Sequence, residues 1–439
     1  MKKIIGFLIV TLLTGTAINS YGMINENNPL DGGWIEIIDG IRILHVQGSN
    51  YEMGYQHGYL LKDEIAENVQ AWVYWGDQLG FSYDDYLSLF WRMHDYIPQD
   101  YIDEMQGMAD GSDLPLNDIF VFNIIAVFHH CCGVAAWGPA TEDGKLIHAR
   151  SHDYSLNIVN PETGKYIHEN AGIIIRKPTF GYGSISIGFH GAVFAFDGLN
   201  EEKVAIGLKS SWSNDRTKDG FPMIFRIREV IDYASTTDEA IDIITSGVAY
   251  SYTLIISDGD ESMAYVVEQT ANELYVGTWN DSTESNSPFW EINHVIRRTN
   301  IFINYETAAL QRDTYDPSTI PLLMMFLKQN VMGEDIFGIQ FFASVPWMHY
   351  YALSNAIEEQ WGNIDLFSMM DILRDVYSGK TDWRFSIVRL LGVYPNMAQW
   401  AACPENGDYL YSAASSDKQA FENPIHQFNL YDLLNSEPP

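Results

Sequence analysis

Basic residues are scarce in this sequence. Among its 439 residues there are 25 lysines and arginines against 58 aspartates and glutamates, so the formal net charge is −33. A chain of this charge repels phosphate groups, which excludes nucleic acid and anionic membrane surfaces from the expected partners. The acidic residues are spread along the chain rather than gathered in a tail, and this distribution is typical of a solubilising surface.

Long apolar runs are also missing. The first apolar stretch, Ile4–Thr14, follows two lysines and is too short to span a bilayer, and no later run is long enough for a transmembrane helix. A short basic start, an apolar centre and small residues between Ala17 and Gly22 are the parts of a signal peptide. We therefore expect residues 1–22 to be a signal peptide and the protein to be secreted or periplasmic.

Cysteine is rare as well, with Cys131, Cys132 and Cys403 as the only three. An exported protein with three cysteines has too few for a disulfide scaffold, and an odd number leaves at least one thiol free. The sequence contains no internal repeat and no low-complexity linker. We therefore expect one large globular domain, in which residues 23–130 form an N-terminal helical segment and residues 131–439 form the main segment.

Two of the cysteines begin a stretch whose sequence predicts a β-hairpin. Small and apolar residues fill Cys131–Gly138, and Lys145–Arg150 forms the returning strand. Between them lies an Asp-Gly pair, which accepts the positive φ of a tight turn. A hairpin places its first and last residues side by side, so the two cysteines are expected to lie beside Arg150 and Asp153.

A thiol beside a cation and a carboxylate has the surroundings of a nucleophilic cysteine. The cation can lower the pKa of the thiol, and the carboxylate can orient a base. The alternative is that Cys131 and Cys132 are small core residues, since free cysteine is among the most buried residue types. Chemistry alone leaves both interpretations open.

The same stretch resembles a family motif. It reads Cys-Cys-Gly-Val-Ala-Ala-Trp-Gly, then Asp-Gly, then His-Ala-Arg-Ser-His-Asp-Tyr, and it is similar to the pattern of the cysteine N-terminal-nucleophile (Ntn) hydrolases. This group includes the relatives of acyl-CoA:6-aminopenicillanate acyltransferase, the choloylglycine hydrolases and the phospholipase B-like proteins. Alignment on Gly133 and Trp137 puts Cys131 at the family's nucleophile and Cys132 where Ser or Thr is usual. Ser151 stands where the family usually has Asn.

The predicted elements agree with this resemblance. Helical periodicity and capping residues predict helices at Ser49–Val69, Tyr86–Tyr96, Pro98–Ala109, Leu116–Phe128, Pro222–Tyr233, Thr237–Ile244 and Ile364–Tyr377. Alternation and turn residues predict strands within Trp34–Gly48 and at Gly172–Arg176, Gly183–Gly188, Ala192–Phe196, Val204–Leu208, Tyr252–Ser257, Met263–Gln269, Glu273–Thr278, Ala398–Cys403 and Tyr409–Ala413. This order fits an α+β layered domain. The resemblance implies the family's four-layer αββα sandwich.

A second segment adds a candidate residue. Arg298–Phe302 resembles the family's Thr-Asn-His-Phe/Tyr segment, in which the asparagine donates to the oxyanion of a tetrahedral intermediate. The resemblance therefore implies this role for Asn300, and a neutral amide donor held in place suits an oxygen that gains charge. Asn293 and Asn286 are alternative positions for the same role.

The remaining site residues have weaker signals. Phe385–Arg389 resembles a family segment that bears an active-site arginine, so Arg389 is a candidate binding residue; a surface or ion-paired arginine is the alternative. Cys132, next to the expected nucleophile, is a second candidate binding residue. His129 and His130 lie next to the cysteines, but an adjacent histidine pair without a second pair of ligands is a weak metal signal. No metal and no cofactor are expected.

The resemblance also implies a mechanism. The chain would be cut between His130 and Cys131, and the new α-amine, with a pKa of about 7.7–8.0, would act as the base. The expected reaction is hydrolysis or acyl transfer on a small-molecule N-acyl amide, through an acyl-thioester on Cys131. In it Arg150 favours the thiolate or positions the substrate, and Asp153 holds the amine.

Three other activities fit the sequence. A papain-like hydrolase would use His148 or His152 as the base without cutting its own chain. A phospholipase B-like ester hydrolase would share the site and differ in its substrate. A non-catalytic binding protein would keep the fold and lack the chemistry.

Overall fold

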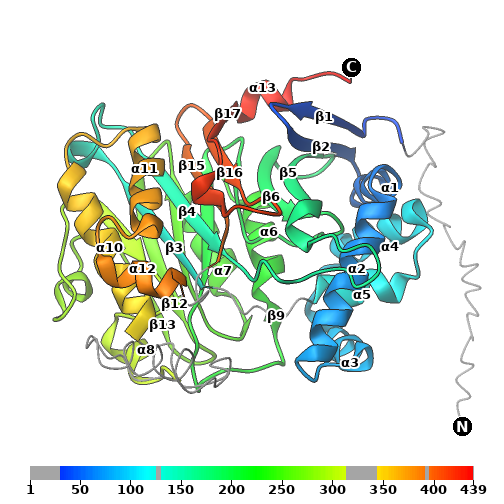
Figure 1. The fold of residues 1–439 in the computed structure, drawn as a ribbon, viewed down its shortest axis with the longest axis horizontal. Helices are drawn as coiled ribbons and strands as arrows, with labels where there is room; N and C mark the ends of the chain where they lie inside the picture. Colours follow the sequence, from blue (N-terminus) through cyan, green and yellow to red (C-terminus); the bar gives the residue numbers. More distant parts are fainter. Residues whose placement is uncertain (1–29, 125–129, 313–343, 391–394, 439) are drawn as a thin grey trace, which may run out of the picture.

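The computed structural model describes residues 30–124, 130–312, 344–390 and 395–438. Two β-sheets lie in the centre of the molecule, and helices cover them on both sides (Figure 1). The expected signal peptide and His129 fall outside the described residues. Within these ranges, no helix is long and apolar enough to cross a membrane.

Both large sheets are mainly antiparallel, with β2 and β5 the parallel neighbours. The first sheet has, in spatial order, β1 (Trp34–Ile38), β2 (Ile41–Gly48), β5 (Ala171–Pro178), β6 (Ser184–Phe189), β7 (Asp197–Asn200), β8 (Val204–Ser210), β11 (Tyr252–Asp258), β12 (Met263–Gln269) and β13 (Leu274–Gly277). The second has β14 (Val295–Arg298), β3 (His130–Ala136), β4 (Ile147–Asp153), β15 (Asn396–Cys403), β16 (Asp408–Ala413) and β17 (His426–Asn429). A small pair joins β9 (Phe221–Pro222) to β10 (Val248–Ala249).

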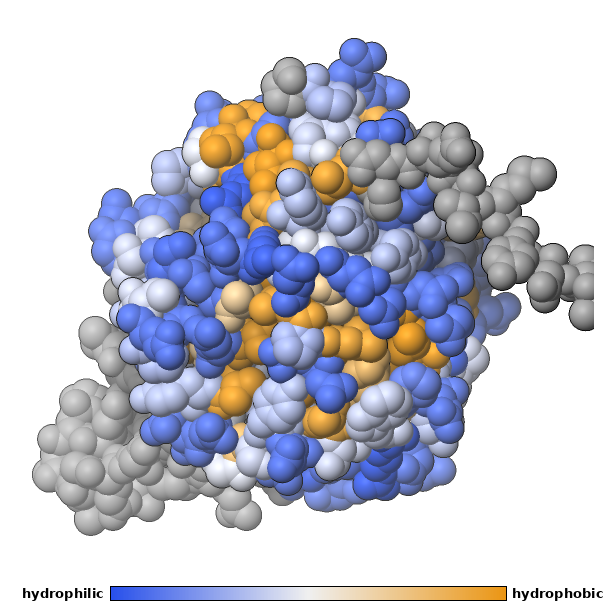
Figure 2. Space-filling view, turned by 90° about the vertical axis from the view of Figure 1, so that its right-hand side faces the viewer, coloured by the Kyte–Doolittle hydropathy of each residue, from blue (hydrophilic) through white to orange (hydrophobic). Residues whose placement is uncertain are grey.

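Two groups of helices cover the outer faces of the sheets. The first sheet is covered by α1 (Asn50–Leu60), α2 (Lys62–Gln78), α3 (Tyr83–Met93), α4 (Gln99–Ser112), α5 (Leu116–Asn123), α6 (Met223–Tyr233) and α7 (Thr237–Thr245). The second is covered by α10 (Ser344–Gln360), α11 (Leu366–Ser378) and α12 (Trp383–Leu390). Two short helices, α8 (Tyr305–Ala309) and α13 (Leu430–Leu434), follow strands. Seen from the side of α1 and α4, the surface mixes hydrophilic residues with apolar patches (Figure 2).

Alternation of side chains along the strands builds the layers. Ile174 of β5 packs with the helices of the first group, whereas Ile173 and Ile175 pack with Trp400 of the second sheet. In β3, Val134 packs under α10 and α11. Successive residues of a strand point to opposite faces, so each sheet contributes to two cores. The α+β class and the four-layer αββα arrangement are therefore confirmed.

Glycines allow α1 and α4 to pack closely. A Cβ on Gly54 would lie 1.9 Å from the Glu104 carbonyl oxygen, and one on Gly107 would lie 2.0 Å from the Tyr51 carbonyl oxygen. Gly111 of α4 faces α1 in the same way. The helix predicted at Pro98–Ala109 stops too early, because Asp110-Gly111 reads as a helix end in the sequence, whereas Gly111 serves the helix contact and α4 continues to Ser112.

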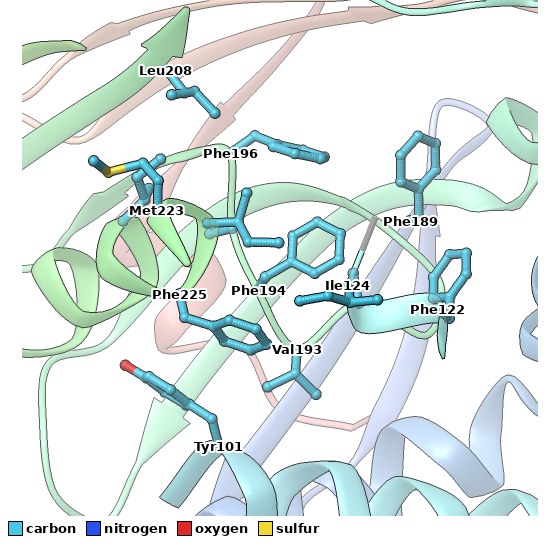
Figure 3. Packing of buried hydrophobic residues seen from close by; sticks show 14 of the residues in the cluster. Tyr101, Phe122, Ile124, Phe189, Val193, Phe194, Phe196, Leu208, Met223 and Phe225 are labelled. Carbon is cyan, nitrogen blue, oxygen red and sulfur yellow. The ribbon is translucent and has the colours of Figure 1, made fainter. Parts of the chain in front are cut away.

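Two other predicted elements differ from the structure. Ser49 caps α1 as expected, but the helix predicted through Val69 is interrupted at Leu61, whose φ of −128° is not helical, and continues as α2. Ala192–Phe196 is a buried irregular segment rather than a strand. The N–H of Val193 bonds to the Asn123 side chain and that of Ala195 to the Ile224 carbonyl oxygen of α6. The phenylalanines of the segment fill the core (Figure 3).

Candidate active site

The predicted hairpin is confirmed, and it forms the centre of the site. β3 and β4 pair antiparallel, with Cys131 opposite His152, Gly133 opposite Arg150 and the backbone of His130 opposite Asp153. The turn contains Gly144 at φ +82°, a conformation that glycine adopts without strain. The hairpin therefore brings Cys131, Arg150 and Asp153 together, as the sequence predicts.

The two cysteines face opposite sides of β3. Cys131 lies on the side of the first sheet, where Arg150 Nη2 donates to its Sγ over 3.2 Å. Cys132 lies in the core under α10 and α11, and its Sγ is 4.0 Å from the Tyr377 hydroxyl. Both thiols are fully buried. Only the Cys131 thiol contacts a cation in the described part of the chain, which favours it over Cys132 as the nucleophile.

Arg150 is fixed by three contacts and is itself fully buried. Besides the sulfur, it donates from Nε to the Leu208 carbonyl oxygen over 2.7 Å and from Nη1 to Asp197, with which it forms an ion pair. Leu208 and Asp197 belong to the first sheet, so the side chain of Arg150 joins the two sheets. A guanidinium held in this way keeps a fixed positive charge beside the sulfur.

This charge does not make the thiol acidic overall. Burial raises the pKa of Cys131, and the negative charge of Asp153 adds to the increase, while Arg150 opposes it. The net shift is upward, because desolvation disfavours the thiolate by more than the cation stabilises it. The expectation of a lowered thiol pKa is therefore corrected: in the uncut chain, Cys131 needs a base.

Asp153 lies in a network that the sequence did not reveal. Its carboxylate accepts hydrogen bonds from Tyr377 Oη over 2.5 Å, Asn396 Nδ2 over 3.0 Å and Ser151 Oγ over 2.9 Å. Burial raises the pKa of Asp153 to about 7, although these donors and Arg150 lower it. Ser151, which stands where the family usually has Asn, also accepts from Asn396 Nδ2 of the neighbouring strand over 2.8 Å.

Asn300 follows β14 and reaches the backbone of the nucleophile. Its Oδ1 accepts from the Cys131 N–H over 2.7 Å, and its Nδ2 donates to the Ser210 carbonyl oxygen over 2.6 Å. A peptide N–H only donates and a carbonyl only accepts, so these partners fix the orientation of the amide. Of the alternatives, Asn293 bonds to the neighbouring His294. Contact with Cys131 favours Asn300; its role as oxyanion donor stays a prediction.

Lys209 is a site residue that the sequence did not predict. This residue of β8 is fully buried, and it reaches across from the first sheet to β3. A Cβ on Gly133 would lie 2.3 Å from both Cε and Nζ of Lys209. The sequence does contain a signal for it: a single lysine in the run Val-Ala-Ile-Gly-Leu-Lys-Ser. The apolar residues of this run predict a strand buried on both faces, where a lysine is unusual.

The other predicted residues have different surroundings. His152 lies across the ladder from Cys131 and packs against Phe196, with ring centroids 4.9 Å apart. The Nδ1 of His148 lies 2.8 Å from Ser257 Oγ, and burial lowers its pKa well below the usual value. Arg389 belongs to α12, and its side chain is outside the described residues. In the described ranges, no cluster of three or more His, Cys, Asp or Glu residues could hold a metal ion.

Fold and site together define a class: an α+β protein of two facing sheets, in which an arginine of β4 contacts a buried cysteine at the second residue of β3. The family model described as acyl-coenzyme A:6-aminopenicillanic acid acyl-transferase matches residues 140–323, which contain Arg150, Asp153, Lys209 and Asn300. Over this region the chain is similar to that acyltransferase family. Cys131 lies nine residues before the matched region.

Individual relatives are distant. The chain is 25% identical over 318 residues to an uncharacterized protein from Archaeoglobus fulgidus, covering 63% of this chain and 51% of that protein. It is 22% identical over 212 residues to the N-acylethanolamine-hydrolyzing acid amidase of Caenorhabditis elegans, covering 45% and 55%. A solved structure of conjugated bile acid hydrolase from Clostridium perfringens covers 69% of this chain and 93% of its own, with 16% identity and a TM-score of 0.38. The chain spans about half the length of the two protein relatives.

Proposed function

We propose that this protein is a cysteine amidohydrolase or acyltransferase that forms an acyl-thioester on Cys131. Its substrate is a small N-acyl amide, and its chain is cut between His130 and Cys131 before it acts. Similarity of residues 140–323 to the acyltransferase family supports chemistry at an amide bond. The similarity to the C. elegans protein named as an amidase that hydrolyses N-acylethanolamines supports an N-acyl group.

The pair of contacts at Cys131 carries this proposal. Its sulfur accepts from Arg150 over 3.2 Å, and its backbone nitrogen donates to Asn300 over 2.7 Å. These are the two atoms that an N-terminal nucleophile uses, the sulfur to attack and the nitrogen, once free, to take the proton. A cysteine that only fills a core needs no guanidinium beside its sulfur, although its buried N–H still needs an acceptor.

Self-cleavage would free the backbone nitrogen of Cys131 as an α-amine. The Cys131 sulfur loses its proton and attacks the carbonyl carbon of His130, so a carbon–sulfur bond forms. The bond from this carbon to the Cys131 nitrogen then breaks, and the nitrogen gains a proton to become the α-amine. Water hydrolyses the thioester, which leaves a carboxylate on His130 and restores the thiol on Cys131.

In turnover the α-amine takes the thiol proton while the sulfur attacks the amide carbon of the substrate. Arg150 stabilises negative charge on the sulfur, because its guanidinium is fixed 3.2 Å away. For Asn300 to donate to the oxyanion, its Nδ2 must leave the Ser210 carbonyl that it contacts in the uncut chain. The leaving amine receives the proton, and water or an acceptor amine then attacks the thioester.

Mass analysis and N-terminal sequencing of the purified protein test this proposal. We expect two chains, the second beginning at Cys131. Cys131→Ala should remain one chain without amidase activity. Cys132→Ser is the matched control: it should be cut and retain at least partial activity, because Cys132 faces the helical core. A Cys131→Ala protein that hydrolyses amides would overturn the proposal.

A further inference from the structure

Lys209 occupies a position that the mechanism above does not use. It is fully buried, and its Nζ donates to the Gly207 carbonyl oxygen over 3.2 Å. In the described part of the chain it forms no ion pair. Its Cε and Nζ fill the space left by the missing side chain of Gly133, two residues after Cys131 on the same face of β3. A side chain at position 133 would exclude it.

The groups around Lys209 favour its neutral form. The guanidinium groups of Arg150 and Arg298 and the thiol of Cys131 lie close enough to Lys209 to act on its charge. Burial lowers the pKa of Lys209 well below its usual value, and the two arginines lower it further. A neutral amine has a lone pair, so it can accept a proton from a thiol.

Self-cleavage requires a base other than the α-amine, which exists only after the chain is cut. Before the cut, the Cys131 nitrogen belongs to a peptide bond and donates its N–H to Asn300, so it has no lone pair that can take a proton. Burial also keeps the thiol of Cys131 protonated by raising its pKa. The proton must therefore pass to another side chain.

Asp153 is the other candidate for this proton, since burial raises its pKa to about 7, but its hydrogen bonds compete with this role. Three donors, on Tyr377, Asn396 and Ser151, already occupy its carboxylate oxygens. To act as a base, it would have to exchange one of these hydrogen bonds for the proton. Lys209, in contrast, has one protein acceptor among the described residues, and no donor occupies its lone pair.

We propose that Lys209 accepts the thiol proton of Cys131 during self-cleavage, an inference that rests on the proposed function. The proton moves from sulfur to Nζ as the sulfur bonds to the His130 carbonyl carbon. When the carbon–nitrogen bond breaks, the ammonium of Lys209 returns the proton to the departing Cys131 nitrogen, which becomes the free amine. Lys209 is neutral again, and the α-amine serves as the base from then on.

The rate of self-cleavage tests this role. The uncut chain is purified quickly, and its conversion to two chains is followed by intact mass. Lys209→Met keeps most of the length of the side chain and removes the amine, so conversion should slow by about 100-fold or more. Lys165→Met is the control, because Lys165 is half exposed and pairs with Glu67 at the surface; it should be cut at the parent rate.

Chemical rescue separates a proton acceptor from a packing residue. Ethylamine added to Lys209→Ala should accelerate cleavage in proportion to the concentration of its neutral form. It should leave the parent and Lys165→Ala unchanged. After rescue and removal of the amine, the cut Lys209→Ala protein should lose less amide turnover than it lost cleavage rate, because the α-amine has become the base.

Two results would overturn the role of Lys209: a Lys209→Met chain that is cut at the parent rate, or a slowed Lys209→Ala chain that ethylamine does not accelerate. Failure of the underlying function gives a different result. In that case the parent chain itself is not cut before Cys131, whatever residue occupies position 209.

Discussion

At Asp153, burial and hydrogen bonding act in opposite directions, and burial has the larger effect. The pKa is raised from 3.8 to about 7, so the folded protein holds a proton that the unfolded chain loses near pH 4. The contribution of Asp153 to stability is therefore fully present below pH 4 and is lost as the pH rises through 7. A shift of about three units corresponds to about 4 kcal/mol.

Substitution by asparagine should remove this dependence. In an uncut Cys131→Ala background, the free energy of unfolding in urea is measured at several pH values between 4 and 8. Asp153→Asn should lose much of the downward slope in this interval. Asp242→Asn, an exposed residue of α7, is the matched control and should keep the slope. Equal slopes in both variants would show that Asp153 titrates in the fold as it does in water.

At the scale of elements, the contact between α1 and α4 is set by backbone, not by side chains. The Cβ of an alanine at position 54 would lie 1.9 Å from the Glu104 carbonyl oxygen, which cannot move as a flexible side chain does. Gly54→Ala should therefore lower the free energy of unfolding by about 1–3 kcal/mol, although alanine favours helix at open positions. Asp103→Ala, on the exposed face of α4, should change it by less than about 0.5 kcal/mol. Urea unfolding would detect this difference, and a stabilised Gly54→Ala would show that the helices can separate freely.

Local sequence signals predicted the elements that depend on local chemistry. The hairpin of β3 and β4 followed from alternation and an Asp-Gly turn, and the end of α11 followed from Gly379, which adopts φ +78°. Errors occurred where contacts between elements decide the outcome. Gly111 reads as a helix stop until α1 lies against it, and Ala192–Phe196 reads as a strand until the core replaces its partners.

The same difference between local signals and contacts between elements applies to the site. Cys131, Arg150 and Asp153 lie in one hairpin, so the sequence could place them together. Tyr377 and Asn396 come from α11 and β15, and Lys209 comes from the opposite sheet. No local pattern marks a residue that becomes functional only when two sheets pack face to face.

On the scale of the whole molecule, a cut before Cys131 would divide one core between two chains. Glu104 of α4 belongs to the first chain and Arg228 of α6 to the second, and both are buried and lie 3.1 Å apart. Asp232 pairs with the same arginine from within α6. The two chains should therefore remain together after cleavage, and native mass spectrometry should show their combined mass.

Two ion pairs join the two chains, and comparing them gives expected energies for the association of the chains. Glu104→Gln removes one of the two carboxylates that pair with the buried guanidinium of Arg228. The free energy of dissociation and unfolding in urea should therefore fall by about 3 kcal/mol. Asp219→Asn breaks the pair between Asp219 and Arg92, which also joins the two chains but is about half exposed; its effect should stay below about 1 kcal/mol, because water already solvates both charges. If the cut chains separate on a sizing column without denaturant, or if the two variants are equally destabilised, then the shared core does not hold the chains together.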